Sequence, residues 1–415
     1  MRIAFDLTHA ITRLGAPHPG GIDQVDMAYA RHFFGEGGGD CVGVHYGLRA
    51  PHVFDAAAGA KIVATADARW REGQGDTGPL DLDALPRRAP KRNALARLAR
   101  GHADSLALRF RSTPGASIPQ GAVYLNVAQH LLEAPFLLSW LDRRPDLVKV
   151  FFIHDLLPLD APEYFGAWNA RFFERRIVTA FKHADAFIVA SEMVRERLAR
   201  ELKARGAAPR PIHVEPLVSP LRVGAAEAAA INSSRPFFLV VGTIEPRKNH
   251  RLLLHAWRDL AAAMGAATPR LAIVGGRGWR TAQIAALLDR APAMRAHVVE
   301  LGSVSDARLA GLMKTCRALL MPSFEEGFGL PLVEALTLGA PVVASDIPVF
   351  REVAGEAAAF LSPIDGPGWR RAVTDLLSDD RAARERARLF TPRDWPAYFA
   401  GVAQFLATLA PKRAQ

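Results

Sequence analysis

Residues 321–341 read MPSFEEGFGLPLVEALTLGAP, and this stretch holds the signals that decide the fold of the second half of the chain. Its apolar start predicts the end of a buried strand, and its glycines predict a loop. Pro331 stands where a helix begins, because the first turn tolerates a residue without an N–H group. Gly339, followed by Pro341, marks the end of that helix. The free N–H groups of such a helix start suit a phosphate.

Two glutamates border this loop, with seven residues between them. We expect Glu326 on the loop and Glu334 about one turn into the helix, where carboxylates can accept hydrogen bonds from sugar and ribose hydroxyls. Gly327 and Gly329 would let a ligand approach the backbone closely. A structural interpretation stays open for each glutamate, since Ser323 and Glu326 match a capping box and Glu334 can complement the helix dipole.

A second segment, VGTIEPRKNH over residues 241–250, follows the first predicted strand of the second half. Asn249 is expected to be the N-cap of the next helix. Arg247 and Lys248 precede it, at the carboxyl end of the strand. Two cations at this position can neutralise a diphosphate, although a solvated basic turn would have the same sequence.

Short apolar runs alternate with helix-period segments along the whole chain. Several runs lack polar alternation, which is typical of parallel strands covered on both faces. The fold class is therefore predicted as α/β, with two Rossmann-like doubly wound parallel-sheet domains facing a cleft. The predicted strands are Ile3–Leu7, Val42–His45, Val123–Asn126, Val148–Ile153, Ala186–Ala190, Phe237–Val241, Leu271–Val274, His297–Leu301, Ala318–Met321, Pro341–Ala344 and Ala358–Leu361.

The strand pattern restarts near residue 236, which divides the 415 residues into two domains of ordinary size. We predict an N-terminal acceptor-side domain over 1–217, a linker over 218–235 and a donor domain over 236–392. A C-terminal helix is expected within 393–415. A Gly-, Pro- and Arg-rich insertion over 71–120 does not fit the pattern of strands and helices.

The run from Ser323 to Val343 resembles the E-x7-E signature of family 4 of the retaining glycosyltransferases, which have the GT-B fold. Residues 242–249 are similar to the same family's G-T-x-x-x-x-K-N donor-phosphate motif. The resemblance covers most of residues 120–365 and leaves the insertion out. It implies sugar transfer with retention at the anomeric carbon. The spacing of the carboxylates offers no candidate nucleophile on the opposite face of the sugar, and the resemblance implies a front-face mechanism, which needs none.

The resemblance also implies residue roles. Glu326 would touch the donor sugar, Glu334 would hold the ribose, and Arg247 and Lys248 would bind the diphosphate. The other expected donor-binding residues are Gly327, Phe328, Gly329 and Leu330 near the sugar and phosphate, and Gly275, Ser303 and Val304 near the base. In similar mannosyltransferases an H-D-x-x-P segment lines the donor sugar, which makes His154 the fourth expected catalytic residue beside Glu326, Arg247 and Lys248.

The first half supplies weaker signals. Gly20 and Gly21 precede a predicted helix and resemble the family's early glycine loop, which can hold an anion or let an acceptor approach. Asp23 and the residue after it replace the usual Gly-Arg pair, so a phosphate role for this loop is in doubt. His154 directly follows a predicted strand. Without the family resemblance, a lone histidine at this position would be interpreted as structural. His130, at an expected helix start, is an additional acceptor-side candidate.

The composition narrows the classes of partner. The chain carries 52 basic and 42 acidic residues, a formal charge of +10. That balance suits anionic small molecules or lipid, although a bias toward arginine explains it equally well. We expect no nucleic-acid partner. The segment 87–111 can form a basic amphipathic helix at a membrane surface or be a solvated insertion.

The sequence also supports expectations about the compartment, metal binding and cofactors. Cys41 and Cys316 cannot build a disulfide framework, which favours a reducing compartment. No signal peptide or membrane-spanning run is evident, so the protein is expected to be cytoplasmic, either free or held at the inner face of the membrane by 87–111. The D-x-D run at Asp81 and Asp83 lies in the insertion, and we expect it to bind no metal. No cofactor is expected besides the nucleotide-sugar.

These observations predict a metal-independent hexosyltransferase of polysaccharide synthesis. The expected donor is GDP-mannose, because the segments at residues 154 and 243–249 look like those of bacterial O-antigen and exopolysaccharide mannosyltransferases. The expected acceptor is a glycan or a lipid-linked saccharide. Two alternatives remain: a GT-B epimerase or hydrolase that acts without an acceptor, and an inactive pseudo-glycosyltransferase that binds a partner.

Overall fold

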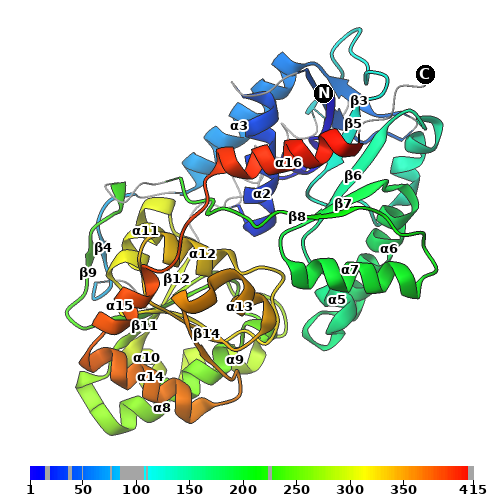
Figure 1. The fold of residues 1–415 in the computed structure, drawn as a ribbon. Coiled ribbons are helices and arrows are strands. Elements are labelled where there is room, and N and C mark those ends of the chain that lie inside the picture. The colour runs from blue at the N-terminus through cyan, green and yellow to red at the C-terminus, as the bar shows by residue number, and fades with distance from the viewer. Residues whose placement is uncertain are drawn as a thin grey trace. The chain divides into compact units, whose positions relative to one another are not determined.

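The computed structural model describes residues 1–14, 19–35, 40–48, 50–74, 77–84, 107–108, 111–222 and 227–409 (Figure 1). The chain forms two compact units, each of which is described by itself. The described parts of Met1–Gly73, Arg92–Leu217 and Asp394–Gln415 form unit 1. Those of Gln74–Lys91 and Val218–Arg393 form unit 2.

Unit 2 is built on a six-stranded sheet in the order β12-β11-β10-β13-β14-β15, with all neighbours parallel. Counted in chain order, this is the 3-2-1-4-5-6 arrangement of a doubly wound sheet, whose order reverses between β10 and β13. The strands are β10 (Phe237–Val241), β11 (Arg270–Val274), β12 (Val298–Gly302), β13 (Leu319–Met321), β14 (Val342–Ser345) and β15 (Ala359–Leu361).

Helices cover both faces of this sheet, which explains why its strands are apolar without alternation. On one face, α8 (His250–Met264), α9 (Ala282–Arg290), α10 (Pro292–His297) and α14 (Gly366–Ser378) share one core. Trp257 and Trp369 are its largest fully buried side chains. The other face carries α11 (Asp306–Thr315), α12 (Leu330–Thr337) and α13 (Pro348–Ala354) (Figure 1). The remaining short helices of the unit are η4 (Pro246–Lys248), η5 (Gly265–Ala267), η6 (Gly355–Ala357) and α15 (Arg381–Ala387).

Unit 1 has a seven-stranded sheet in the order β3-β2-β1-β5-β6-β7-β8. All pairs are parallel except β2 with β3, which is antiparallel at the edge. The strands are β1 (Ile3–Asp6), β2 (Cys41–His45), β3 (His52–Phe54), β5 (Val123–Asn126), β6 (Val148–Ile153), β7 (Ala186–Val189) and β8 (Ile212–Val214). The strand order reverses between β1 and β5.

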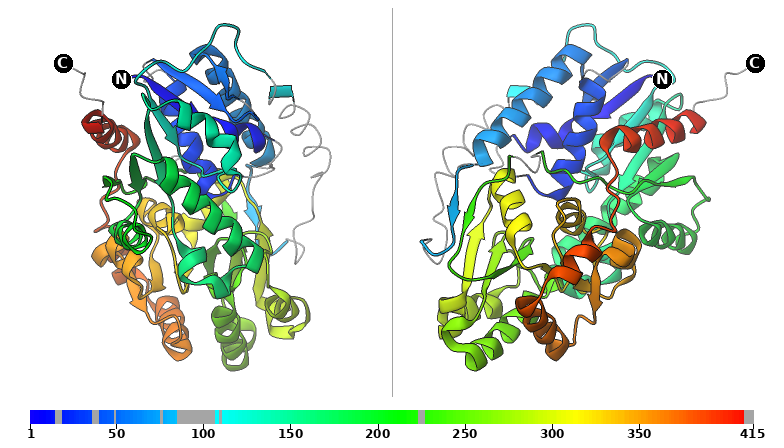
Figure 2. Two further views of the ribbon diagram at one scale, coloured as in Figure 1. Left: turned by 90° about the vertical axis from the view of Figure 1, so that its right-hand side faces the viewer. Right: turned by 60° about the vertical axis from the view of Figure 1, so that its left-hand side comes forward.

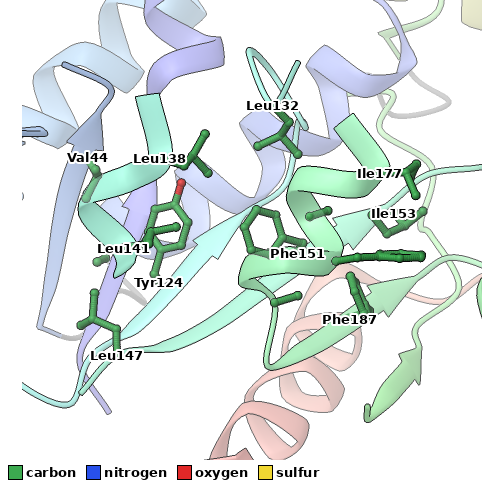
Figure 3. Packing of buried hydrophobic residues seen from close by; sticks show 14 of the residues in the cluster. Val44, Tyr124, Leu132, Leu138, Leu141, Leu147, Phe151, Ile153, Ile177 and Phe187 are labelled. Atoms are coloured by element: carbon green, nitrogen blue, oxygen red, sulfur yellow. The ribbon is translucent and has the colours of Figure 1, made fainter. Parts of the chain in front are cut away.

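Two layers of helices cover this sheet. One layer contains η1 (Pro135–Arg143), α6 (Ala167–His183) and α7 (Glu192–Ala204), whose apolar side chains pack on the strands. Figure 3 shows this core, with Tyr124 and Phe151 of the sheet among leucines of η1 and its flanking turns. The unit's other helices are α1 (Thr8–Thr12), α2 (Gly21–Phe34), α3 (Ala56–Gln74), α5 (Leu157–Asp160) and η2 (Pro162–Tyr164).

The last helix of the chain, α16 (Trp395–Leu409), matches its predicted bounds and packs in unit 1 beside α2, far away in sequence (Figure 2). The hydroxyl groups of Tyr29 and Tyr398 lie 2.7 Å apart in the core. The Phe399 ring stacks on His32 at 3.9 Å. Long-range packing of this kind leaves no signal in the local pattern, so the sequence could not show which unit the helix joins.

Every strand predicted from the sequence is present, within a few residues at its ends. Among the described residues, four further strands are present, and all are short: β3, β8, and the pair β4 (Leu80–Asp81) and β9 (Ile231–Asn232). The pair joins a strand of the predicted insertion to a strand of the predicted linker, and residues 77–84 pack in unit 2. The basic segment 87–111 lies outside the described residues except for 107, 108 and 111. Among the helices that the structure describes, none is long and apolar enough to cross a membrane.

Candidate donor site in unit 2

The loops that follow β10 and β13 meet at the point where the strand order of unit 2 reverses. In doubly wound sheets, ligands bind beside the carboxyl ends of the strands at such a reversal. The loop after β10 carries Arg247 and Lys248, and the loop after β13 carries Glu326. The sheet topology therefore brings together the two segments that the sequence singled out, although Arg247 and Glu326 are 79 residues apart in the sequence.

Arg247 and Lys248 both bind the Glu326 carboxylate. Arg247 Nη1 donates to Glu326 Oε2 at 2.7 Å, and Lys248 Nζ donates to Oε1 at 2.5 Å. The hydroxyl of Ser323 donates to Oε1 at 2.8 Å. Arg247 also contacts Glu245 Oε1 through Nη2 at 2.7 Å. Two cations and two carboxylates thus form a compact, largely buried cluster.

The pKa of Glu326 reflects this environment. Burial alone would raise it, but the charges of Arg247 and Lys248 and their hydrogen bonds lower it to about 2. Glu326 is therefore ionised throughout the neutral range. The carboxylate keeps both cations in place with their charges compensated, as buried charges require.

Backbone contacts hold the two loops in this register. Phe324 N–H donates to the Arg247 carbonyl at 2.9 Å, and Arg247 Nη1 donates to the Glu325 carbonyl at 2.7 Å.

The prediction that Asn249 is an ordinary N-cap is wrong. It does precede α8, but its backbone is left-handed (φ 52°), and its side chain donates to the Pro322 and Pro363 carbonyls at 3.1 and 2.8 Å instead of capping the helix. Asparagine adopts the left-handed conformation more readily than most residues. It therefore suits this position through its backbone as well as through the two hydrogen bonds of its side chain.

The loop after β13 leads directly into α12, as predicted. Gly329 precedes the helix with φ 99°, and a Cβ on it would lie 2.7 Å from the Phe350 ring. At the other end, Gly339 has φ 72°, and the N–H groups of Gly339 and Ala340 donate to Leu336 and Ala335 in a Schellman motif. The capping-box interpretation is wrong, because Ser323 and Glu326 bind each other four residues before the helix begins.

Glu334 faces a different environment from Glu326. Its side chain is buried on α12, and the described residues give its carboxylate no hydrogen bond. Burial, with a contribution from the charge of Asp306, raises its pKa to about 8. A carboxyl group kept neutral by burial is ready to ionise when a ligand supplies hydrogen-bond donors. The sequence could not identify Asp306 as its electrostatic neighbour.

The loops after β11 and β12 lie next to the loop after β10. Gly275 N–H donates to the Gly302 carbonyl at 2.7 Å, just before Ser303 and Val304. Ser303 is exposed and Val304 is half-buried. Ile244 N–H donates to the Gly276 carbonyl at 2.9 Å. Gly275, Ser303 and Val304, the expected base-contacting residues, therefore lie at the same edge of the sheet as the Glu326 cluster.

Gly275 is required for the approach of two of these loops. It has φ 145°, and a Cβ on it would lie 2.0 Å from the Gly242 carbonyl oxygen. We expect Gly275→Ala to lower the free energy of unfolding by about 3 kcal/mol or more, since backbone must move and the torsion is strained. Gly276→Ala is the matched control, because a Cβ there has no neighbour within 4 Å. Urea unfolding of both variants tests this, and equal losses would contradict it.

A surface hollow of unit 2 lies away from this edge. It is lined by Arg251, His255, Gln283, Ala286, Leu287, Arg290 and Ala291. None of the predicted site residues lines it. We place the candidate site at the loop cluster instead, because Arg247, Lys248 and Glu326 converge there beside the carboxyl ends of the strands.

His154 lies in unit 1, at the carboxyl end of β6. Its Nε2 contacts the Val127 carbonyl at 2.9 Å, so Nε2 must carry the proton and Nδ1 must be an acceptor. Burial lowers its pKa to about 4. His154 is therefore a neutral imidazole, suited to accept a hydrogen bond from a hydroxyl group and unsuited to neutralise a phosphate.

Gly20 and Gly21 stand at the start of α2, as predicted, but this helix start already holds an anion. The Asp23 carboxylate accepts from Gly20 N–H at 2.6 Å and from Arg13 Nε and Nη2 at 3.0 and 2.9 Å. Its Oδ1 lies 2.6 Å from His9 Nε2. Burial would raise the pKa of Asp23, but His9 and Arg13 lower it to about 2. The departure from the Gly-Arg pair thus has a structural consequence, because an incoming phosphate would meet this carboxylate.

Two other predicted features have structural partners. His130 lies in a turn, which corrects its placement at a helix start, and its Nε2 is 3.1 Å from Thr12 Oγ1. In the D-x-D run, Asp81 accepts from the N–H groups of Asp83 and Ala84, and Asp83 binds Ser234 N–H and Arg270. In the part of the chain that the structure describes, no group of three or more metal-binding side chains gathers.

Residues 225–390 match the family model described as "Glycosyl transferases group 1". The matched segment coincides with the sheet of unit 2 and contains both loops of the Glu326 cluster.

Curated relatives agree with the resemblance seen in the motifs. The chain is 33% identical to the serotype-specific mannosyltransferase WbdA of Escherichia coli over 272 residues, 61% of this chain and 32% of that protein. It is 29% identical to the O-antigen chain mannosyltransferase B of Escherichia coli over 234 residues, 55% of this chain and 60% of that protein. The chain thus spans about a third of the length of WbdA. The predicted similarity to bacterial O-antigen mannosyltransferases is confirmed by these relatives.

Solved structures share the fold. HepE from Anabaena, in complex with UDP, superposes with a TM-score of 0.58 at 16% identity over 98% of this chain and 99% of its own. Sucrose-phosphate synthase from Thermosynechococcus elongatus gives a TM-score of 0.52 at 16% identity, over 99% of both chains. These likenesses confirm the predicted fold class, two Rossmann-like parallel-sheet domains of the GT-B type.

Proposed function

We propose that the protein is a retaining, metal-independent glycosyltransferase that transfers mannose from GDP-mannose to a glycan or a lipid-linked saccharide, since residues 225–390 match the model of the glycosyl transferases group 1. The observation that carries this proposal is the cluster of Arg247, Lys248 and Glu326 at the reversal point of the unit 2 sheet. The mannose donor rests on the likeness to WbdA and to the O-antigen chain mannosyltransferase B.

In the proposed reaction, Arg247 and Lys248 bind the donor diphosphate. When the bond between the sugar and the diphosphate breaks, negative charge accumulates on the departing phosphate. Cations that are already fixed stabilise that charge more than they stabilise the bound donor, which is the condition for catalysis. Glu326 holds both cations in position and contributes its carboxylate at the edge where the sugar would lie.

Glu334 and the base loops supply the rest of donor recognition. The ribose hydroxyls would donate to Glu334 and draw it into its ionised form. The backbone around Gly327 and Leu330 is proposed to contact the sugar and the phosphate, and Gly275, Ser303 and Val304 the base. His154, a neutral imidazole, is proposed to accept a hydrogen bond from a sugar hydroxyl.

The proposal is tested by a screen of GDP-, UDP-, ADP- and dTDP-sugars for binding and for acceptor-independent hydrolysis. We expect GDP-mannose to bind most tightly and to release mannose slowly. NMR of the first-formed anomer should show retained configuration. Conversion of UDP-GlcNAc to its epimer would instead identify an epimerase, and failure to bind any donor would identify a pseudo-enzyme.

The acceptor side is proposed to involve unit 1. The Asp23 carboxylate at the start of α2 favours an uncharged saccharide hydroxyl over a phosphate at the Gly20–Gly21 loop. A place of action on the cytoplasmic side of the membrane fits a nucleotide-sugar donor. The segment 87–111 would be the natural contact with lipid there if it forms the basic amphipathic helix that its sequence allows.

A further inference from the structure

The helix α6 of unit 1 presents an exposed face that mixes large apolar side chains with arginines. This α6 face consists of Trp168, Arg171, Phe172, Arg175 and Val178, which recur at helical spacing along one side of the helix. Trp168 is 71% exposed, Val178 50% and Phe172 41%. Trp168 and Phe172 are neighbours, with ring centroids 6.4 Å apart.

The helix does not need this face for folding. Its opposite side packs in the core of unit 1 through Phe173, Ile177, Ala180 and Phe181. Single exposed apolar residues are ordinary, but adjacent tryptophan and phenylalanine rings left in water on a helix that is already anchored form a patch. Such a patch indicates a surface that another phase or molecule covers.

The charges on the α6 face are all positive. Arg171 lies over the Trp168 ring at 5.9 Å, and neither Arg171 nor Arg175 pairs with an acid among the described residues. The acid of the helix, Glu174, is bound to Arg205, the residue after α7, at 2.6 and 2.8 Å. The face therefore offers two uncompensated cations beside its apolar side chains.

The helix η1 packs beside α6. Arg176 of α6 binds Glu133 at 2.8 Å, and Lys182 binds Asp142 at 2.7 Å, so η1 lies alongside α6. Phe136, near the start of η1, is 58% exposed. The element packed beside α6 thus carries an exposed aromatic side chain of its own.

We propose that the α6 face docks unit 1 on a bilayer surface that carries anionic phospholipids. Tryptophan and phenylalanine enter the boundary between head groups and acyl chains, while arginines bind the phosphates above them. Charge complementarity favours this occupant, because the two arginines of this face pair with no acid in the described part of the chain and suit a sheet of negative charge. This membrane contact is distinct from the segment 87–111 and does not depend on the proposed chemistry.

The test is co-sedimentation of the full-length protein with vesicles of phosphatidylcholine, with and without phosphatidylglycerol. We expect binding only to the anionic vesicles, weakened by added salt. The double variant Trp168→Ser/Phe172→Ser should bind at least about tenfold more weakly, since the apolar anchor is lost. Arg171→Gln/Arg175→Gln should bind roughly 30-fold more weakly at low salt, since each arginine near an anionic surface contributes about fivefold.

Matched controls change the same residue types elsewhere. Leu48→Ser/Leu389→Ser removes exposed apolar side chains, and Arg290→Gln/Arg295→Gln removes exposed arginines of unit 2. Both should bind vesicles like the unchanged protein, and the α6 variants should keep its affinity for donor. The proposal is overturned if the protein ignores anionic vesicles or if the α6 variants bind them as well as the controls do. Loss of self-association in the α6 variants without any vesicle binding would assign the face to a second copy of the chain.

Discussion

Replacing Lys248 with methionine is expected to lower the rate of sugar transfer about a thousandfold while the protein stays folded. The ammonium group is one of two cations that would face the departing phosphate, and removing one such preorganised donor typically costs a factor of about 100 to 1,000. Methionine keeps an unbranched apolar stem beside Gly242, where the lysine stem lies now. Glu326 remains paired with Arg247, so no buried charge is left alone.

The measurement is kcat with GDP-mannose and a saccharide acceptor, together with the urea unfolding curve. Lys203→Met, at an exposed position of α7, is the control for loss of a lysine and should change neither quantity. Glu326→Ala is a less clean test, because it removes the shared partner of two cations and should also reduce stability. If Lys248→Met keeps more than about a tenth of the activity, the assignment of the diphosphate site is wrong.

Glu334→Gln is expected to stabilise the free protein and to weaken its binding of donor. The pKa of Glu334 is raised to about 8 in the folded protein, so the carboxyl stays protonated where the unfolded chain would be ionised. The folded state then binds more protons than the unfolded state from about pH 4.5 to pH 8, and its stability falls as pH rises through that window. Glutamine removes this loss, which is worth about 3 kcal/mol at pH 7.

The pH dependence makes this prediction specific. The gain in free energy of unfolding should be near zero at pH 4, grow up to about pH 8 and stay constant above it. Glu356→Gln, at an exposed position, should show no such trend. Unfolding in urea at several pH values measures the difference. An equal stability of Glu334→Gln and the unchanged protein at pH 8.5 would contradict the proposed burial of a neutral carboxyl group.

The same residue should make donor binding depend on pH. Ribose hydroxyls would donate to ionised Glu334, so donor affinity of the unchanged protein should rise as pH approaches 8. The glutamine variant should bind donor about 10- to 100-fold more weakly at pH 8, as expected for losing a hydrogen bond to a charged group. Its affinity should be flat between pH 6 and 8. Isothermal titration with GDP-mannose checks both points.

Much of the architecture followed from local patterns. Uninterrupted apolar runs specify strands buried on both faces, and Pro331 and Gly339 fix where α12 begins and ends. These signals are local, because a strand covered on both sides and a helix terminus each impose requirements on the residues at that position. The two loops of the candidate site were recognisable for the same reason.

Contacts between distant segments were decided only by the tertiary structure. The pairing of Glu326 with Arg247 and Lys248, the neutral state expected of Glu334 beside Asp306, and the docking of α16 in unit 1 each join residues that no periodicity relates. The charge state of a carboxyl group depends on its burial and its neighbours in space, and both arise from chain packing. The sequence by itself therefore determined the elements and the residue types of the site, whereas the tertiary structure decided which carboxylate is ionised, which is neutral and which cations they hold.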